Sequence, residues 1–212
     1  QGDWSSDVCS SELRALPHDS ARHHVTGSAR YVDDLPEARE LLHGAVGLST
    51  CANARVIAME LDAVRQSKGV RAVLTAADIP GANSCGPMLP DDPILASGRV
   101  QYAGQALFAV AADSVTLARA AVARANIEYE AEPPVLTARE AVAAQAFVLP
   151  TERLRRGEPD AAIETAAHRL RGQVSVGGQE QFYLEGQVAM ATPGEGGQMT
   201  VHSSTQYPSR SE

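Results

Sequence analysis

The sequence predicts an α+β protein of two unequal parts, and three observations lead to this fold class. Between residues 36 and 132 the runs follow the order strand, strand, helix, strand, loop, strand, strand, helix, strand, which suits an α+β fold or an α/β sandwich. An alanine-rich connection over residues 133–150, bounded by prolines, separates this region from a second unit, residues 151–212. Hydrophobic residues form 44% of the 212 residues but aromatic residues only 4%, so the core must consist mainly of small and aliphatic side chains.

The amino-terminal residues carry little structural signal. Residues 1–16 contain many serine and acidic side chains and lack periodicity, so we expect them to be disordered or foreign to the natural sequence. The tail, residues 209–212, is also expected to be foreign to the natural sequence. Residues 17–35 form a polar segment that leads into the first domain. His23 and His24 lie in it, but adjacent side chains point in different directions and no further ligand follows at a suitable spacing. Solvated histidines are favoured there over a metal site.

The first domain, residues 36–132, begins with short apolar runs bounded by turn formers, the pattern of buried strands. Helical spacing over residues 61–68 ends at Gly69, and a second helix runs from the capping residue Ser114 to Ala125. Residues 80–98 contain many prolines and glycines and form a long loop. The expected strands are residues 41–48, 54–60, 70–75, 99–102, 106–111 and 127–130, with a single helical turn at 76–79.

The linker and the second unit continue the mixed pattern. A short helix is expected over residues 137–144, and another opens at residues 157–160, where Pro159 suits a first turn. Strands are expected at residues 169–176, 182–192 and 199–204, with a turn at 193–197. At about 65 residues this unit is near the size at which an isolated core becomes marginal, so we expect it to be the start of a larger domain.

Charge and cysteine content exclude several classes of function. A net charge of −8 argues against binding to nucleic acid or to an anionic membrane. No apolar run approaches the ~18 residues needed to span a bilayer, and no signal peptide is visible, so a soluble cytoplasmic protein is expected. Three cysteines, Cys9, Cys51 and Cys85, are too widely spaced to indicate a zinc or iron–sulfur site.

The most informative stretch is Gly177-Gly178-Gln179-Glu180-Gln181-Phe182-Tyr183-Leu184-Glu185. Two glycines permit a close backbone approach or a positive φ, and a polar pair follows immediately before a hydrophobic run. Such an arrangement can present polar groups to a pocket. From the residues alone, a bulge or tight turn with Gln179 and Glu180 facing water is the favoured interpretation, because glycine pairs are common in turns.

This stretch, followed by Gly186-Gln187-Val188-Ala189 and Ser203-Ser204-Thr205-Gln206, resembles the xanthine dehydrogenase and aldehyde oxidase family. The similarity is to the start of the molybdenum-binding large subunit, nearest to its bacterial xanthine dehydrogenases, and covers most of residues 17–208. The family usually has histidine where this chain has Gln181. The resemblance implies an α/β-hammerhead domain at residues 36–132 and the beginning of a molybdopterin-binding domain at residues 151–212.

The resemblance also implies the chemistry. Family members hydroxylate electron-poor carbons of purines or aldehydes at a molybdenum–molybdopterin centre and pass electrons to 2Fe-2S clusters, FAD and NAD. Gln179 matches a glutamine that lies beside the molybdenum and hydrogen-bonds an oxo ligand without ligating the metal, and Gly178 would allow that approach. An amide suits this role because it donates hydrogen bonds without adding charge. The clusters and FAD would lie on partner domains or subunits, in a hetero-oligomer.

Catalytic competence is not expected of these residues alone. The family's Gly-Gly-Gly-Phe-Gly-Gly-Lys-Glu motif is absent from the sequence, and its glutamate base would lie beyond residue 212, so no catalytic residue is assignable. We therefore expect an inactive amino-terminal fragment of a xanthine dehydrogenase subunit. The alternatives are an aldehyde or N-heterocycle oxidoreductase of the same family and a non-catalytic assembly module. The roles of Glu180, Glu185 and Gln206 stay open, with structural hydrogen bonding favoured.

Overall fold

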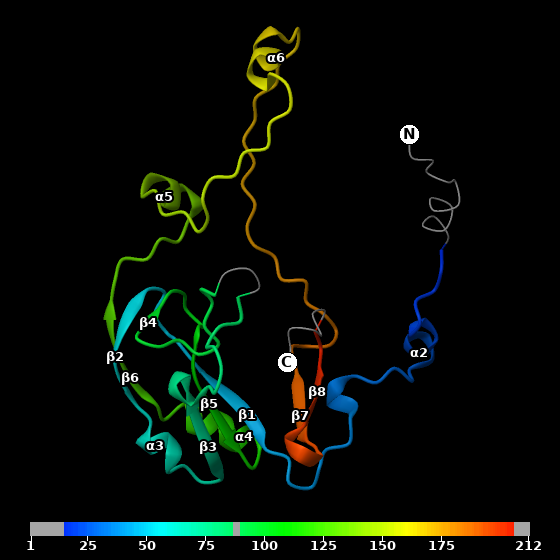
Figure 1. Ribbon diagram of the computed structural model, residues 1–212, viewed down its shortest axis with the longest axis vertical. Coiled ribbons are helices and arrows are strands. Elements are labelled where there is room, and N and C mark those ends of the chain that lie inside the picture. The colour runs from blue at the N-terminus through cyan, green and yellow to red at the C-terminus, as the bar shows by residue number, and fades with distance from the viewer. Residues whose placement is uncertain (1–14, 87–89, 206–212) are drawn as a thin grey trace. The chain divides into compact units, whose positions relative to one another are not determined.

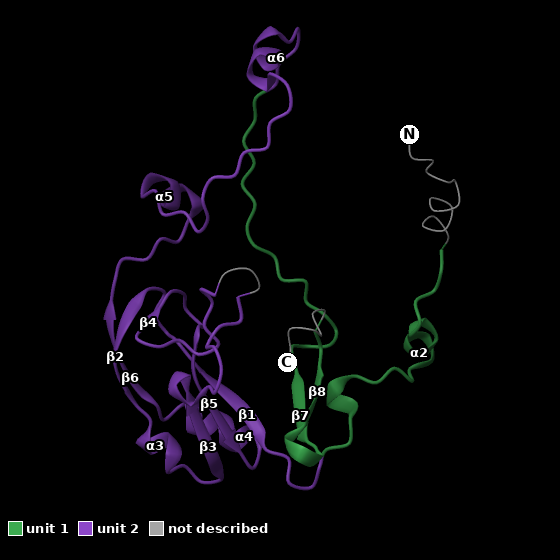
Figure 2. Cartoon of the chain, in the orientation of Figure 1, with its two compact units in different colours: residues 1–37, 171–212 green, residues 38–170 purple. Residues whose placement is uncertain are grey.

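The structure is a computed structural model that describes residues 15–86 and 90–205 (Figure 1). The chain divides into two compact units: unit 1 contains residues 1–37 and 171–212, and unit 2 contains residues 38–170 (Figure 2). Strands and helices are mixed along the chain, and the strands pair in antiparallel sheets, which confirms the predicted α+β class. Unit 1 is thus assembled from two stretches that are far apart in the sequence.

Unit 2 contains two three-stranded antiparallel sheets. The first has the order β1-β5-β3, and its strands are β1 (His43–Leu48), β5 (Ala106–Ala112) and β3 (Val70–Thr75). The second has the order β4-β2-β6, and its strands are β4 (Arg99–Val100), β2 (Ala54–Glu60) and β6 (Asn126–Ala131). Helix α4 (Val115–Val122) packs on the first sheet, while α3 (Asp62–Arg65) leads into β3 and the turn η2 (Ala76–Asp78) follows it.

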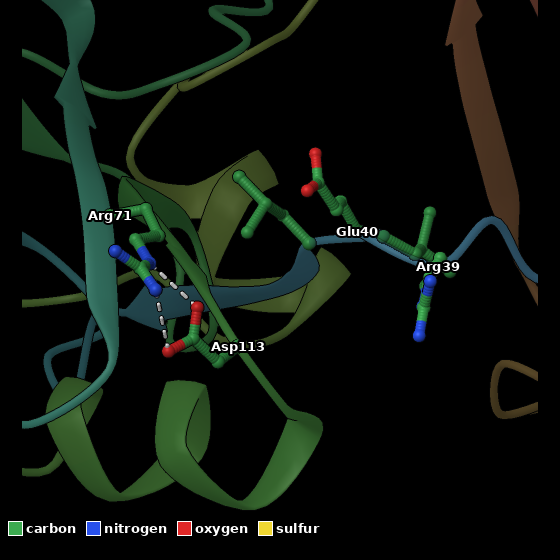
Figure 3. A pocket seen from close by; sticks show the side chains of 6 residues that line it. Arg39, Glu40, Arg71 and Asp113 are labelled. Atoms are coloured by element: carbon green, nitrogen blue, oxygen red, sulfur yellow. Dashed lines mark hydrogen bonds and ion pairs between the residues drawn. The ribbon is translucent and has the colours of Figure 1, made fainter.

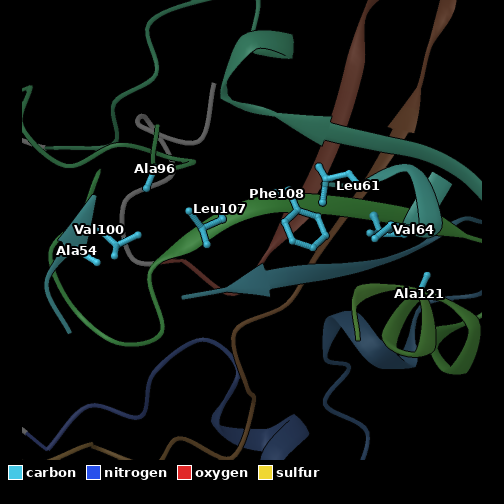
Figure 4. Close-up of a cluster of buried hydrophobic side chains, with 9 residues drawn as sticks. Ala54, Leu61, Val64, Ala96, Val100, Leu107, Phe108 and Ala121 are labelled. Atoms are coloured by element: carbon cyan, nitrogen blue, oxygen red, sulfur yellow. The ribbon is translucent and has the colours of Figure 1, made fainter. Parts of the chain in front are cut away.

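The core of unit 2 forms around β5, because a central strand can bury residues that an edge strand leaves exposed. Leu107, Phe108 and Val110 are each only 1% exposed. Small and aliphatic side chains from neighbouring elements complete the cluster, as the scarcity of aromatic residues predicts (Figure 4). Its other members are Ala54, Leu61, Val64, Ala96, Val100 and Ala121.

The glycine at position 47 is required by packing. Gly47 pairs with Phe108 across β1 and β5, and a β-carbon built on it would overlap the Phe108 ring. The ring of the largest fully buried residue therefore occupies the space that a side chain at position 47 would need. Cores packed at crystal-like density have no slack for such an addition.

The helix starts of unit 2 follow the signals in the sequence. The Ser114 hydroxyl accepts a hydrogen bond from the Leu117 N–H (3.3 Å) and begins α4, as predicted. Thr137 and Glu140 form a reciprocal capping box at the start of α5 (Ala138–Ala143). Pro159 occupies the first turn of α6 (Pro159–Thr165), again as predicted.

Unit 1 is built from short elements. Helix α2 (Ala21–Thr26) and the turn η1 (Val32–Asp34) precede unit 2 in the sequence. Strands β7 (Ala189–Pro193) and β8 (Met199–Ser203) pair as an antiparallel hairpin through the turn η3 (Glu195–Gly197). Both strands of this hairpin were predicted, although β7 begins seven residues later than expected.

Several sequence-based expectations are wrong. Residues 169–176 and 182–188 are not strands, since neither stretch pairs with another strand among the described residues. Hydrophobic alternation predicts a strand only where a partner exists to accept its backbone hydrogen bonds. The segment before the first domain contains a helix that was not predicted, α2, which carries the exposed His23 and His24. Over the described residues, no helix is both long and apolar enough to cross a membrane.

Candidate functional site

The candidate site is the segment from Gly177 to Glu185, here called the Gln179 segment, which lies in unit 1. It has no regular secondary structure, and every residue from 177 to 184 is exposed. No hydrogen bond joins residues 177–184 to any other described residue. The side-chain amide of Gln179 and the carboxylate of Glu180 are therefore free to contact a ligand.

The left-handed backbone conformation occurs at a different residue from the glycines that the sequence suggests. Neither Gly177 nor Gly178 has a positive φ, and a β-carbon at either would meet no atom within 4 Å. Phe182 takes the left-handed conformation instead, with φ of 55°. This conformation is unusual for a bulky residue, and residues held in it are often found near functional sites. The glycine pair thus leaves open space beside Gln179, while the positive φ falls at Phe182.

Hydrophobic side chains of the same segment are also uncovered. Phe182 is 90% exposed and Leu184 is 88% exposed, which is unusual for two large apolar residues so close in the sequence. The wall of a site for a large prosthetic group combines a few polar contacts with an apolar surface. An unpaired amide beside exposed apolar side chains provides the same combination of chemical groups.

The carboxyl end of the segment is anchored. The Glu185 carboxylate accepts a hydrogen bond from the Val32 N–H through Oε1 (2.8 Å), in a half-buried position. The Ser204 hydroxyl accepts from the Val188 N–H (3.1 Å) and donates to the Gly186 carbonyl (2.8 Å). Sequence reasoning did not find these contacts, because 153 residues separate Val32 from Glu185 and no local pattern links them.

A hollow of about 880 Å³ adjoins this anchor, lined by residues 183–187 and 203–205. One stretch belongs to the first part of the sequence pattern, residues 177–189, and the other to its second part, residues 203–206. The structure therefore brings the two parts of the pattern together around this hollow. Gln206, the last residue of that pattern, lies outside the described residues, as do residues 1–14 and Cys9.

The two adjacent histidines line a separate hollow of about 500 Å³ in unit 1, together with Arg30 and Tyr31. The His23 Nδ1 atom lies 3.1 Å from the Ser28 hydroxyl, and the His24 ring lies beside the Tyr31 ring. Within the described part of the chain, no group of three or more His, Cys, Asp or Glu side chains is placed to hold a metal ion.

A third hollow, of about 600 Å³, lies in unit 2 and is lined by Arg39, Glu40, Arg71 and Asp113 among others (Figure 3). The Arg71 guanidinium donates to both oxygens of Asp113, at 2.6 Å and 3.2 Å. This bidentate pair raises the pKa of Arg71 through its hydrogen bond to Asp113. The two opposite charges of Arg71 and Asp113 therefore satisfy each other.

Comparison with known proteins assigns both parts of the chain. Residues 26–133 match the family model described as "Aldehyde oxidase and xanthine dehydrogenase, a/b hammerhead domain". Residues 141–212 match the model described as "Molybdopterin cofactor-binding domain", and this match includes the Gln179 segment. The predicted hammerhead domain followed by the beginning of a molybdopterin-binding domain is therefore confirmed.

Individual relatives support the same assignment. The chain is 36% identical to xanthine dehydrogenase 1 of Arabidopsis thaliana over 97% of its own length and 15% of that protein's. It is also 36% identical to aldehyde oxidase 2 of Cavia porcellus over 92% of the chain and 14% of the relative. The solved structure of quinoline 2-oxidoreductase from Pseudomonas putida 86 superposes with a TM-score of 0.75 at 25% identity, covering 92% of this chain and 27% of that one.

The chain thus spans about one seventh of the length of these curated relatives. Within that span the hammerhead match, residues 26–133, is followed by the cofactor-binding match, residues 141–212. The chain belongs to the aldehyde oxidase and xanthine dehydrogenase family.

Proposed function

We propose that the chain is the amino-terminal part of the molybdenum-binding polypeptide of a xanthine dehydrogenase. In this proposal the whole protein hydroxylates purines, converting hypoxanthine and xanthine to urate, and electrons pass to 2Fe-2S clusters, FAD and NAD. The observation that carries the proposal is the exposed, unpaired Gln179 amide within the residues that match a molybdopterin cofactor-binding domain.

Gln179 and Gly178 are proposed to contact the cofactor. When bound, the molybdopterin centre supplies a metal that takes up the electrons removed from the substrate carbon. The Gln179 amide donates a hydrogen bond to that centre without adding charge, whereas a carboxylate would repel anionic oxygen there. Open space beside Gly178 supports a close approach by a ligand. The general base, the substrate-binding residues and the redox partners are assigned to parts of the protein beyond this chain.

The domain division and the assembly belong to the same proposal. We assign residues 17–35 to a leading segment, residues 36–132 to the hammerhead domain, residues 133–150 to a linker and residues 151–212 to the cofactor-binding domain. Iron–sulfur and FAD groups would be carried by partner domains or subunits, which makes a hetero-oligomer the expected assembly in the cytoplasm.

An aldehyde or N-heterocycle substrate is the second candidate, and one observation supports it as well as it supports the first. The identity to the Cavia porcellus aldehyde oxidase equals the identity to the Arabidopsis thaliana xanthine dehydrogenase. Turnover of xanthine, benzaldehyde and quinoline by the full-length protein separates the candidates. The first candidate is supported if xanthine has the highest kcat/KM of the three. The second candidate is supported if benzaldehyde or quinoline has the highest kcat/KM.

The role of Gln179 is tested by Gln179→Ala in the full-length protein loaded with cofactor. We expect kcat to fall by about 10²-fold, the usual cost of removing one donor aimed at developing charge. Gln198→Ala is the matched control, because Gln198 is another exposed amide of unit 1, outside the Gln179 segment. Turnover by Gln179→Ala equal to that of the control would remove Gln179 from the site.

A further inference from the structure

Glu185 lies at the junction between the Gln179 segment and the rest of unit 1. We propose that Glu185 is a positioning residue, which holds the carboxyl end of the Gln179 segment against the turn at residues 31–34 and thereby sets where Gln179 can reach. This inference rests on the proposed function of Gln179 and deepens it. Neither the family match nor the sequence pattern assigns a role to this carboxylate.

The partner of Glu185 is a hydrogen-bonded backbone turn. Consecutive N–H groups of Tyr31 and Val32 donate to two different carboxylates, Asp34 at 3.0 Å and Glu185 at 2.8 Å. The Asp34 bond is local and closes the η1 turn, which the Leu35 N–H completes by donating to the Val32 carbonyl (3.1 Å). Glu185 therefore binds an amide whose direction is already set by the turn.

The residues after Glu185 are fastened as well. Ser204 bonds Gly186 and Val188 through its hydroxyl, and its own N–H donates to the Val188 carbonyl (3.1 Å). The residues before Glu185 make no hydrogen bond to the described chain as far back as Gly177. Residues 177–184 thus form a free arm that carries Gln179, and Glu185 is the first hydrogen-bonded residue after it. Phe182, within this arm, has a positive φ.

Loss of the carboxylate should release the arm without unfolding the hairpin. The β7–β8 ladder and the Ser204 contacts do not involve Glu185, so they persist in its absence. A freed arm populates many conformations, and only a fraction of them place the Gln179 amide correctly. The expected defect is therefore in the geometry of the site and not in the fold.

The test compares Glu185→Ala and Glu185→Gln with Glu195→Ala in the full-length, cofactor-loaded protein. Glutamine retains an acceptor oxygen for Val32, whereas alanine does not. Glu195 is a matched control, since it is an exposed carboxylate of unit 1 whose side chain binds no described residue. Three measurements are made: hydrogen–deuterium exchange of peptides covering residues 28–36, the electron paramagnetic resonance spectrum of the reduced molybdenum centre, and kcat and KM.

For Glu185→Ala we expect exchange at Val32 to accelerate about tenfold, as for the loss of one charge-assisted hydrogen bond. The molybdenum spectrum should change and kcat should fall with KM preserved, while Glu185→Gln restores most of all three properties. A Glu185→Gln variant as defective as Glu185→Ala would show that the charge matters and would overturn the positioning role. So would an unchanged spectrum and kcat in Glu185→Ala when Gln179→Ala is impaired. If Gln179→Ala itself keeps full turnover, the proposed function has failed independently.

Discussion

The hydroxyl group of Tyr129 offers a sharp test of the packing of unit 2. Tyr129 lies on β6 and packs against the hydrophobic core, and its hydroxyl oxygen is buried. Among the described residues this hydroxyl has no hydrogen-bond partner. A buried polar group without a hydrogen-bond partner destabilises the folded state by the full free energy of its desolvation. Removal of the oxygen alone should therefore stabilise unit 2.

The magnitude follows from the burial of the residue. An unsatisfied buried hydroxyl costs about 1–3 kcal/mol, and because Tyr129 as a whole is only half-buried, we expect the lower end for Tyr129→Phe. A gain of about 1 kcal/mol corresponds to a rise in Tm of roughly 2–4 °C for a chain of this size. Differential scanning calorimetry of the 212-residue chain measures this shift in the transition of unit 2.

Tyr102→Phe is the matched control. Tyr102 belongs to the same unit and is 51% exposed, so its hydroxyl is solvated in both the folded and the unfolded chain. This control should leave Tm within about 1 °C of the parent, as surface substitutions usually do. A Tm for Tyr129→Phe below that of the parent would refute the reasoning, since it would show that the hydroxyl is satisfied in the folded protein by an internal water molecule.

Two further predictions concern packing and pH. Gly47→Ala should lower the free energy of unfolding by about 1–3 kcal/mol, because the added methyl group overlaps the Phe108 ring. Urea denaturation followed by circular dichroism measures this loss of stability. An unchanged denaturation midpoint would contradict the overlap. The pKa of Glu140 lies below its ordinary value, chiefly because its carboxylate accepts from the Leu136 N–H and also from Thr137. A lowered folded-state pKa means that this cap contributes stability above the ordinary glutamate pKa of ~4.3 and loses it as the pH falls through the lower folded value. Carboxyl chemical shifts across an acid titration should therefore place the Glu140 midpoint below that of exposed glutamates, and a midpoint at or above theirs would exclude the capping box.

Local signals explain why most of unit 2 could be predicted from the sequence. Strands β2 and β3 begin and end where their apolar runs do, and the caps at Ser114 and Thr137 start the helices that follow them. Each of these features depends on residues within a few positions of one another. Interactions of short range are encoded in adjacent residues, so a sequence pattern is sufficient to locate them.

The sequence by itself determined the α+β class, the order of strands and helices along residues 36–132, the small-residue core and the position of the Gln179 segment. Only the tertiary structure decided that Gly47 must remain a glycine beneath Phe108, that the positive φ of the Gln179 segment falls at Phe182, and that Glu185 binds Val32 across 153 residues. The reason is physical: a strand needs a partner and a carboxylate needs a donor, and both partners here are distant in sequence. Residues 169–176 and 182–188 have the composition of strands but remain irregular because no neighbouring strand accepts their hydrogen bonds within the described chain.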